Sequence, residues 1–463
     1  MIKKVPDTLI LILSILVCFV ALTWVIPSGA FDRIVLNGRE VIVPDSYQSV
    51  PSNPQGFFDL LKAPTLGFIS AVQIIAFVFL VGGSFSVISR TGAIDAGLQS
   101  ILKFALNNPT YKKSMMVMLT VLFSLAGATF GMSEEVLVFI LITIPLSHSL
   151  GYDRLAGVFV PFIGAGAGFA GAFSNPFTIG IAQGIAELPP FSGAEYRFLV
   201  WILFTSLTVG FLWWYLNKLE KDAHYSPLYG TDAANEDIGE NPTENLTFNW
   251  RRKLIIFAFI TAIALLIIGV SHWDWYINEI SGLFFGLGIV AAVLGRLSGN
   301  NASKAFAAGA KDMMTAALVI AFSKGILIVA EDGKIIDTIL LHLSSLVQDF
   351  HKIAAVQIMF FVQTAINFFI PSGSGQAALT MPIMAPLSDL LGITRQTAVL
   401  AFQLGDGLSN MIIPTSGVTM GVLSIAKIPY VTWVKWIGRL VIVYFILAII
   451  VLIPPVLFNW GPF

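Results

Sequence analysis

The sequence predicts an all-α integral membrane protein made of two related halves. Hydrophobic residues account for 56% and charged residues for 11% of the 463 residues, whereas soluble domains carry about a quarter charged residues. The mean hydropathy is +0.83. Apolar runs such as Thr8 to Val25 and Leu440 to Val456 approach the roughly 20 residues that a helix needs to cross the hydrocarbon. Short alternating segments, which are typical of a β-barrel, are absent from the sequence.

Apolar length and Pro/Gly punctuation predict about nine spans. We place them at residues 7–28, 65–89, 152–187, 195–217, 252–270, 275–296, 312–330, 395–425 and 431–457. The single cysteine, Cys18, lies in the first span, so no intramolecular disulfide is expected. A net charge of −1 argues against a nucleic-acid partner.

Two further apolar stretches, 112–150 and 352–391, each have a Gly/Ser-rich centre. The centres are FGMSEE at Phe130 to Glu135 and IPSGSGQ at Ile370 to Gln376. Because polar turns cannot face lipid, we expect each stretch to enter the membrane and return, as a re-entrant helical hairpin beside a protein-lined cavity. The alternative is two full spans joined by an ordinary loop.

The polar segment 218–251 divides the chain into a first half, 1–217, and a second half, 252–463. An N-terminus in the cytoplasm places 18 of the 26 Lys and Arg residues inside, as the positive-inside rule requires. The segment 218–251 is then a cytoplasmic linker, and we expect a multi-pass protein of the cell (inner) membrane in contact with lipid.

Similar decapeptides occur 241 residues apart in the two halves. PLSHSLGYDR begins at Pro145 and PLSDLLGITR at Pro386, and six of the ten letters agree. In the predicted orientation the first hairpin opens to the inside and the second to the outside. An inverted repeat of this kind is typical of secondary transporters, whose halves alternate access to a central site.

The spans 152–187 and 395–425 are each interrupted at mid-length. The breaks are AFSNPFTIG, residues 172–180, and LSNMIIPTSGVTMG, residues 408–421. Asn175 fits a helix cap with Pro176 at the first helical position, and Thr415 or Ser416 fits a second cap. The two hairpin tips and the two interrupted spans would bring four helix N-termini together. Their N–H groups suit a carboxylate, and the side-chain oxygens beside them suit Na⁺. Alternatively the breaks serve packing, as do the small residues of GAGAGFAGAF from Gly164.

Polar side chains embedded in these segments are further candidates, because a charge at the bilayer centre costs about 2.5–3.5 kcal/mol. They are Glu134, Glu135, Asn175, Asn367, Gln376, Gln403, Asp406 and Asn410. The two glutamates fit equally well as residues that satisfy the dipole of a helix capped by Ser133. Asp406 has no such explanation, so we expect it to meet a cation, a proton or a substrate ammonium group. Lys324 is the only embedded base, and we expect it to pair with an acid; contact with the substrate is the alternative.

No motif indicates an enzyme, a resident metal or a cofactor. The five histidines are scattered and form no His-x-x-x-His or Cys-rich ligand set. The sequence has no Walker loop, so ATP would not power transport directly. A channel remains the less favoured alternative to a transporter.

Three segments are distinctive in combination. They are SNPFTIGIAQGIAELPPFSG from Ser174, NFFIPSGSGQAALTMPIMAPLSDLLGITRQTAVLAFQLGDGLSN from Asn367, and IIPTSGVTMGVL from Ile412. These segments resemble the YfcC-like group of the ion transporter superfamily, which is related to anaerobic C4-dicarboxylate carriers and to basic amino acid antiporters. The similarity extends over almost the whole chain.

The resemblance implies a homodimer with a fixed scaffold domain and an elevator-like transport domain built from the hairpins and broken helices. By position, it implies substrate or ion contacts at Ser133, Glu134, Glu135, Asn175, Thr178, Ser372, Gly373, Ser374, Gln376, Thr415 and Ser416. Na⁺ would lie near Ser133 and Asn175 and near Ser374 and Thr415. Dicarboxylate carriers of the superfamily often have Ser-Asn-Thr at both tips, where this chain has MSEE and SGSGQ. The coupling ion is therefore open between Na⁺ and H⁺.

The sequence thus predicts a secondary transporter of small carboxylated metabolites. Three embedded acids, Glu134, Glu135 and Asp406, against one base, Lys324, favour an amino acid with a cationic side chain, such as arginine, lysine or ornithine. A C4-dicarboxylate carried with Na⁺ or H⁺ is the alternative.

Overall fold

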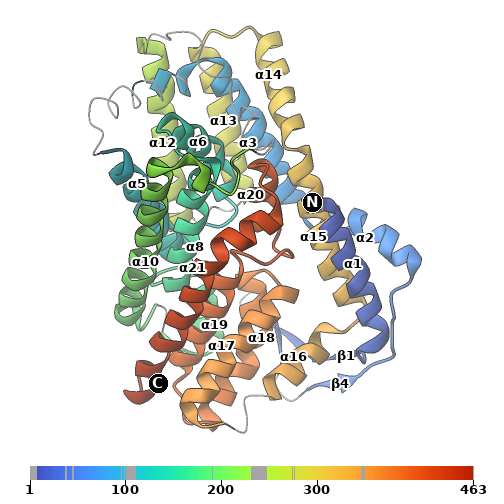
Figure 1. Cartoon of the computed structure of the whole chain (residues 1–463). Helices are drawn as coiled ribbons and strands as arrows, with labels where there is room; N and C mark the ends of the chain where they lie inside the picture. Colours follow the sequence, from blue (N-terminus) through green and yellow to red (C-terminus); the bar gives the residue numbers. More distant parts are fainter. Residues whose placement is uncertain are drawn as a thin grey trace.

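The computed structural model describes residues 8–36, 39–43, 46–94, 96–97, 100, 111–189, 191–230, 248–273, 275, 277–345 and 350–461. Most of these residues lie in helices (Figure 1). Within this part of the chain, six helices are long and apolar enough to cross a membrane, and a helix pair bent by 42° would supply a seventh. The chain is therefore a multi-pass membrane protein, as its composition predicts.

The first half contains the helices α1 to α10. Their bounds are α1 (Thr8–Val25), α2 (Phe57–Ser70), α3 (Val72–Arg90), α5 (Tyr111–Phe130), α6 (Val136–Ser149), α7 (Arg154–Val158), α8 (Gly164–Gly171), α9 (Ile181–Ile185) and α10 (Ala194–Lys221). The π-helical turn η1 (Phe159–Ile163) joins α7 to α8, and η2 (Pro176–Gly180) runs directly into α9. A 3₁₀ turn, η3 (Ala223–Tyr225), follows α10.

The second half contains the helices α12 to α22. Their bounds are α12 (Trp250–His272), α13 (Ile277–Leu294), α14 (Gly299–Asp312), α15 (Met314–Asp332), α16 (Ile336–Ser345), α17 (Lys352–Phe369), α18 (Gly373–Leu390), α19 (Arg395–Ser409), α20 (Gly417–Ile425), α21 (Tyr430–Val451) and α22 (Ile453–Leu457). Helix α10 extends into the predicted linker, and residues 231–247 of that linker lie outside the described residues.

Two helix pairs have the same lengths in the two halves. Helices α2 and α14 each have 14 residues, and α3 and α15 each have 19 residues. Their first residues are 242 positions apart, at Phe57 and Gly299 and at Val72 and Met314. The spacing nearly equals that of the repeated decapeptides.

These helix pairs pack against each other through glycine, α2 against α15 and α3 against α14. A Cβ on Gly67 would lie 2.0 Å from the carbonyl oxygen of Ala321, and one on Gly309 would lie 2.3 Å from that of Gly82. Gly67 and Gly309 are themselves 242 residues apart. A close backbone contact at a glycine therefore occurs once for each half.

The chain reverses direction at both predicted hairpin tips. The ring centroids of Phe123 and Phe139, each eight residues from Gly131, are 4.9 Å apart. In the second hairpin, Gln376 Nε2 donates a hydrogen bond to the carbonyl oxygen of Gln363 at 2.8 Å. In a straight helix these residues, 16 and 13 positions apart, would be separated by about 24 Å and about 20 Å, so both segments fold back on themselves.

The small residues of α8 bring it against α5. A Cβ on Gly168 would lie 1.8 Å from the carbonyl oxygen of Ser124, and one on Gly127 would lie 2.1 Å from that of Ala165. No other residue type has room at these two positions. The close helix approach predicted from GAGAGFAGAF is therefore confirmed.

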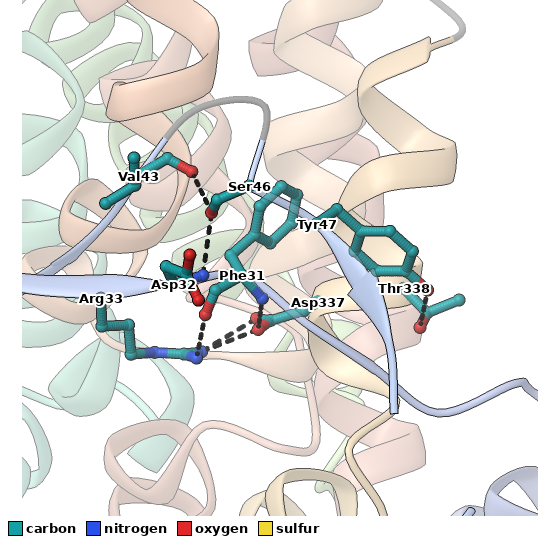
Figure 2. Close-up of polar contacts among 8 residues, drawn as sticks. All are labelled: Phe31, Asp32, Arg33, Val43, Ser46, Tyr47, Asp337 and Thr338. Carbon is teal, nitrogen blue, oxygen red and sulfur yellow. Dashed lines mark hydrogen bonds and ion pairs between the residues drawn. The ribbon is translucent and has the colours of Figure 1, made fainter. Parts of the chain in front are cut away.

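Between α1 and α2 the chain forms four short strands that an all-α fold does not include. They are β1 (Gly29–Ala30), paired with β4 (Gln48–Ser49), and β2 (Arg33–Leu36), paired with β3 (Arg39–Ile42), both antiparallel. Figure 2 shows how this segment is anchored to the start of α16. Arg33 forms an ion pair with Asp337 at 3.0 Å, and the backbone N–H of Phe31 donates to the same carboxylate at 2.9 Å. Tyr47 is hydrogen-bonded to Thr338 at 2.8 Å.

Candidate functional site

A cavity of about 180 Å³ lies where four helical segments begin. Val136 is the first residue of α6 and Gly373 the first of α18, Thr178 lies in η2, and Ser416 caps α20. All four residues line this cavity, two from each half. Helix starts carry unpaired N–H groups and a partial positive charge, so together they favour an anionic group.

Most of the predicted site residues are in this region. Nine line the cavity: Ser133, Glu134, Glu135, Thr178, Ser372, Gly373, Ser374, Asn410 and Ser416. Five do not line it and are at most 3% exposed: Asn175, Asn367, Gln376, Asp406 and Thr415. Gln403 is also buried, and its Nε2 donates to the carbonyl oxygen of Phe169 at 2.5 Å.

The first hairpin tip differs from the prediction that Ser133 caps a helix. Helix α6 begins at Val136, and Ser133, Glu134 and Glu135 form a turn in which the N–H of Val136 donates to the carbonyl oxygen of Ser133 at 3.3 Å. The carboxylate of Glu135 accepts a hydrogen bond from the N–H of Ser133 at 3.0 Å. Glu135, and not Ser133, is therefore the side chain that satisfies the backbone at this tip.

The first break begins with the predicted cap. Asn175 Oδ1 accepts hydrogen bonds from the N–H groups of Phe177 at 2.9 Å and Thr178 at 3.3 Å, and Pro176 occupies the first helical position. Gly131, at φ +69°, lies against this amide, since a Cβ there would be 2.6 Å from Asn175 Oδ1. The two lone pairs of that oxygen are thereby used.

Asp406 lies under the second hairpin tip. Its side chain is fully buried, and its Oδ1 accepts a hydrogen bond from Asn410 Nδ2 at 2.9 Å. A Cβ on Gly373 would lie 2.7 Å from Asp406 Oδ2 and 2.5 Å from Thr178 Cγ2. The start of α18 therefore rests between the carboxylate of α19 and the first break.

Several buried oxygens around the cavity have no hydrogen-bond partner among the described residues. They are Thr178 Oγ1, Asn367 Oδ1, Asp406 Oδ2, Asn410 Oδ1 and Thr415 Oγ1. Buried polar atoms are normally hydrogen-bonded, so a group of unpaired oxygens beside a cavity fits a binding site for a cation or a hydrogen-bond donor.

Lys324 also lines the cavity, where the less favoured of its two expected roles, contact with the substrate, would be possible. The expected ion pair is not found: within the described residues no carboxylate lies within 4.0 Å of its Nζ. Helix α15, which carries Lys324, packs against α20, the second half of the broken span. This long-range contact, which has no local sequence signal, places the base at the cavity.

Comparison with known families gives a match along nearly the whole chain. The family model DcuC, described as C4-dicarboxylate anaerobic carrier, matches residues 5–457. The chain belongs to the DcuC family.

Relatives of this DcuC-family chain extend over its full length. It is 34% identical to the "Putative basic amino acid antiporter YfcC" of Escherichia coli (strain K12), over 97% of this chain and 96% of that protein. It is 29% identical to an uncharacterized protein of Haemophilus influenzae, over 96% of each chain. The Alcanivorax borkumensis YdaH transporter has a TM-score of 0.43 at 15% identity, covering 99% of this chain and 100% of that one.

Membership in the DcuC family settles the class of the protein. The resemblance to YfcC that the sequence segments indicated is confirmed. The chain is a transporter of small molecules, not an enzyme.

Proposed function

We propose that this DcuC-family chain is a secondary active transporter of small carboxylated metabolites, with a basic amino acid as the preferred substrate. The observation that carries the proposal is the composition of one cavity, where four helix starts, a base and two acids of the first half meet, with Asp406 of the second half buried behind Gly373. An amino acid with a cationic side chain has a carboxylate that suits the helix starts and the base, and cationic groups that suit the acids.

The substrate carboxylate would bind at the positive side of the cavity. Lys324 lines the cavity, and so do Ser372, Gly373 and Ser374 at the start of α18. A charge-assisted hydrogen bond from Lys324 adds to the backbone N–H groups of the helix start.

The cationic groups of the substrate would bind at the acids. Glu134 and Glu135 line the cavity, and Asp406 lies directly beneath Gly373. Three acids against one base balance the charges of arginine, lysine or ornithine better than those of a dianion.

An elevator-like alternating access mechanism fits the architecture. Helix α6 has 14 residues and is therefore about 21 Å long, short of the roughly 30 Å hydrocarbon thickness; this supports a re-entrant hairpin. The equal helix lengths and glycine contacts 242 residues apart support an inverted repeat. The hairpins and broken helices would form the moving domain, and the other spans the scaffold of a homodimer in the inner membrane with a cytoplasmic N-terminus.

Two coupling ions are consistent with the buried oxygens. The unpaired oxygens of Thr178, Asn367, Asp406 and Asn410 would suit Na⁺, for which Ser374 and Thr415 remain a further predicted location. Alternatively, protonation of Asp406 would couple transport to H⁺.

A C4-dicarboxylate is the second candidate substrate, favoured by Lys324 and by the helix starts, which all attract anions. For a dianion, the acids of the cavity would have to be protonated or neutralised by a bound cation.

Uptake and counterflow in proteoliposomes would separate these functions. Labelled arginine, lysine, ornithine, succinate, fumarate and malate would be offered under imposed Na⁺ or proton gradients, with protein-free liposomes as the control. We expect saturable uptake of a basic amino acid that the unlabelled amino acid accelerates in counterflow. Uptake of dicarboxylates alone would reject the preferred substrate, and single-channel currents in a planar bilayer would reject the transporter.

A further inference from the structure

A second hollow, of about 440 Å³, lies between α10 and α21, which run alongside each other (Figure 1). It shares no lining residue with the cavity described above. Its lining comprises Phe211, Trp214, Tyr225, Pro227, Thr432, Lys435, Trp436 and Arg439. Neither the central site nor the proposed transport mechanism uses these residues.

The hollow is positively charged. Lys435 and Arg439 are exposed, lie one turn apart on α21, and form no ion pair with any described residue. A third cation, Lys218, places its Nζ 5.8 Å from the ring centroid of Tyr225. Among the described residues, no acid lines the hollow, so its charge favours an anion.

The walls of the hollow are aromatic. The rings of Phe211 and Trp436 are 5.6 Å apart, and those of Trp214 and Tyr225 are 5.8 Å apart. Trp436 is 9% exposed, and its indole N–H has no acceptor among the described residues. Trp and Tyr beside Lys and Arg are typical of the level at which a membrane protein meets lipid headgroups.

An apolar track leads away from the hollow along α21. Ile442, Ile446 and Ile450, which follow Arg439 at helical spacing, are 62%, 52% and 54% exposed. Residues three and four apart lie on one face of a helix. The exposed isoleucines therefore continue from Arg439 to the C-terminal end of α21, as an acyl chain would.

We propose that this hollow binds an anionic phospholipid, with the phosphate between Lys435 and Arg439 and one acyl chain along Ile442 and Ile446. The aromatic walls and the isoleucine track favour a lipid over a soluble phosphate, and the cations favour an anionic lipid over a zwitterionic one.

Native mass spectrometry of the full-length protein tests this site. Detergent-purified protein would be titrated with phosphatidylglycerol or phosphatidylcholine of identical acyl chains. We expect one phosphatidylglycerol to be retained at least tenfold more strongly than phosphatidylcholine. The double variant Lys435→Gln/Arg439→Gln would lose this preference. The matched variant Lys304→Gln/Lys311→Gln, which removes two exposed cations from α14, would keep it.

Two further measurements keep the test decisive. The charge-conserving variant Lys435→Arg/Arg439→Lys should retain the lipid, and this result separates loss of charge from loss of fold. Millimolar inorganic phosphate should not displace the lipid. The proposal would be overturned if the protein retained both lipids equally, or if the α14 variant lost the preference to the same extent. It would also be overturned if phosphate displaced the lipid, or if the charge-conserving variant lost the lipid while its elution on size exclusion was unchanged.

Discussion

Gly373 lies against the carboxylate of Asp406, so that a Cβ at position 373 would come within 2.7 Å of Asp406 Oδ2. Gly373 is the first residue of α18 and Asp406 belongs to α19. The contact joins a hairpin tip to a broken span, and it brings the only buried acid of α19 to the start of another helix.

Replacement of Gly373 with Ala should reduce transport at least tenfold. The added methyl group would clash with Asp406 and Thr178 and push the tip away from the broken spans. The measurement is uptake in proteoliposomes at matched protein density. Gly417→Ala is the control, since Gly417 also follows a capping serine and its Cβ would meet nothing closer than 3.6 Å. Similar activities of the two variants would contradict this account of the tip.

Replacement of Asp406 with Asn should reduce uptake of a basic amino acid about a hundredfold or abolish its ion coupling. The substitution keeps the size of the side chain and removes its charge, so the buried site loses its attraction for a cation. Uptake under Na⁺ and proton gradients measures both effects. Asp389→Asn, in a surface ion pair with Arg395, serves as the control. Unchanged coupled uptake would remove Asp406 from the site.

Replacement of Lys324 with Gln should raise the KM for carboxylated substrates about tenfold, which corresponds to about 1.4 kcal/mol. Hydrogen bonds to charged groups contribute about 1.5–3 kcal/mol, so this loss corresponds to the lower end of that range. Lys62→Gln provides the comparison, because Lys62 forms an exposed ion pair with Asp59. A KM that stays constant while only the thermal stability falls would indicate a structural role for Lys324.

Replacement of Gly168 with Ala should destabilise the fold by about 1–3 kcal/mol, the usual cost of overpacking. The new Cβ would lie 1.8 Å from the carbonyl oxygen of Ser124, so α8 would have to move away from α5. A Cβ on Gly210 would meet no atom of the described residues within 4 Å, so Gly210→Ala should be neutral or stabilising by up to about 1 kcal/mol. Thermal unfolding in detergent compares them, and equal Tm values would show that the helices do not pack this closely.

The stability of the segment after α10 should fall as the pH rises. Asp153, which precedes α7, accepts hydrogen bonds from Ser226 at 2.6 Å and Tyr215 at 2.5 Å. Burial raises the pKa of Asp153 above its ordinary value, although these hydrogen bonds act in the opposite direction. A raised carboxyl pKa in the folded state stabilises at low pH, and this contribution is lost as the pH rises through that pKa.

Hydrogen exchange of residues 222–230 between pH 4 and pH 7 measures this effect of Asp153. We expect protection that decreases with pH after correction for the intrinsic exchange rate, and a smaller decrease in the Asp153→Asn variant. The same pH dependence in both proteins would assign it to another group.

The sequence predicted the features that depend on local chemistry. Asn175 with Pro176, and Ser416 before Gly417, are caps whose side chains and backbone preferences act within a few residues, and both begin a helix as predicted. The two reversals of the chain are predicted because glycine and serine interrupt the apolar runs.

Features that depend on distant contacts have weaker sequence signals. The sequence leaves Lys324 between an ion pair and a substrate contact, and the packing of α15 on α20 brings it to the cavity. The strands between α1 and α2 are not predicted, and they are joined to Asp337, about 300 residues away. The span expected at 65–89 also differs, since the structure has two helices that meet at Ala71, with Pro64 inside the first. Pro64 predicts a boundary at residue 65, but α2 continues through it and packs against α15.

The equal lengths of α3 and α15 determine where the chain tolerates insertions. Each added residue turns the rest of a helix by about 100° and advances it by 1.5 Å. One extra residue before Gly82 would rotate the glycine face of α3 away from Gly309 on α14. Length changes should therefore be tolerated between α1 and α2 or between α10 and α12, outside the paired helices. A scan of insertions and deletions would find these segments permissive and the paired helices intolerant.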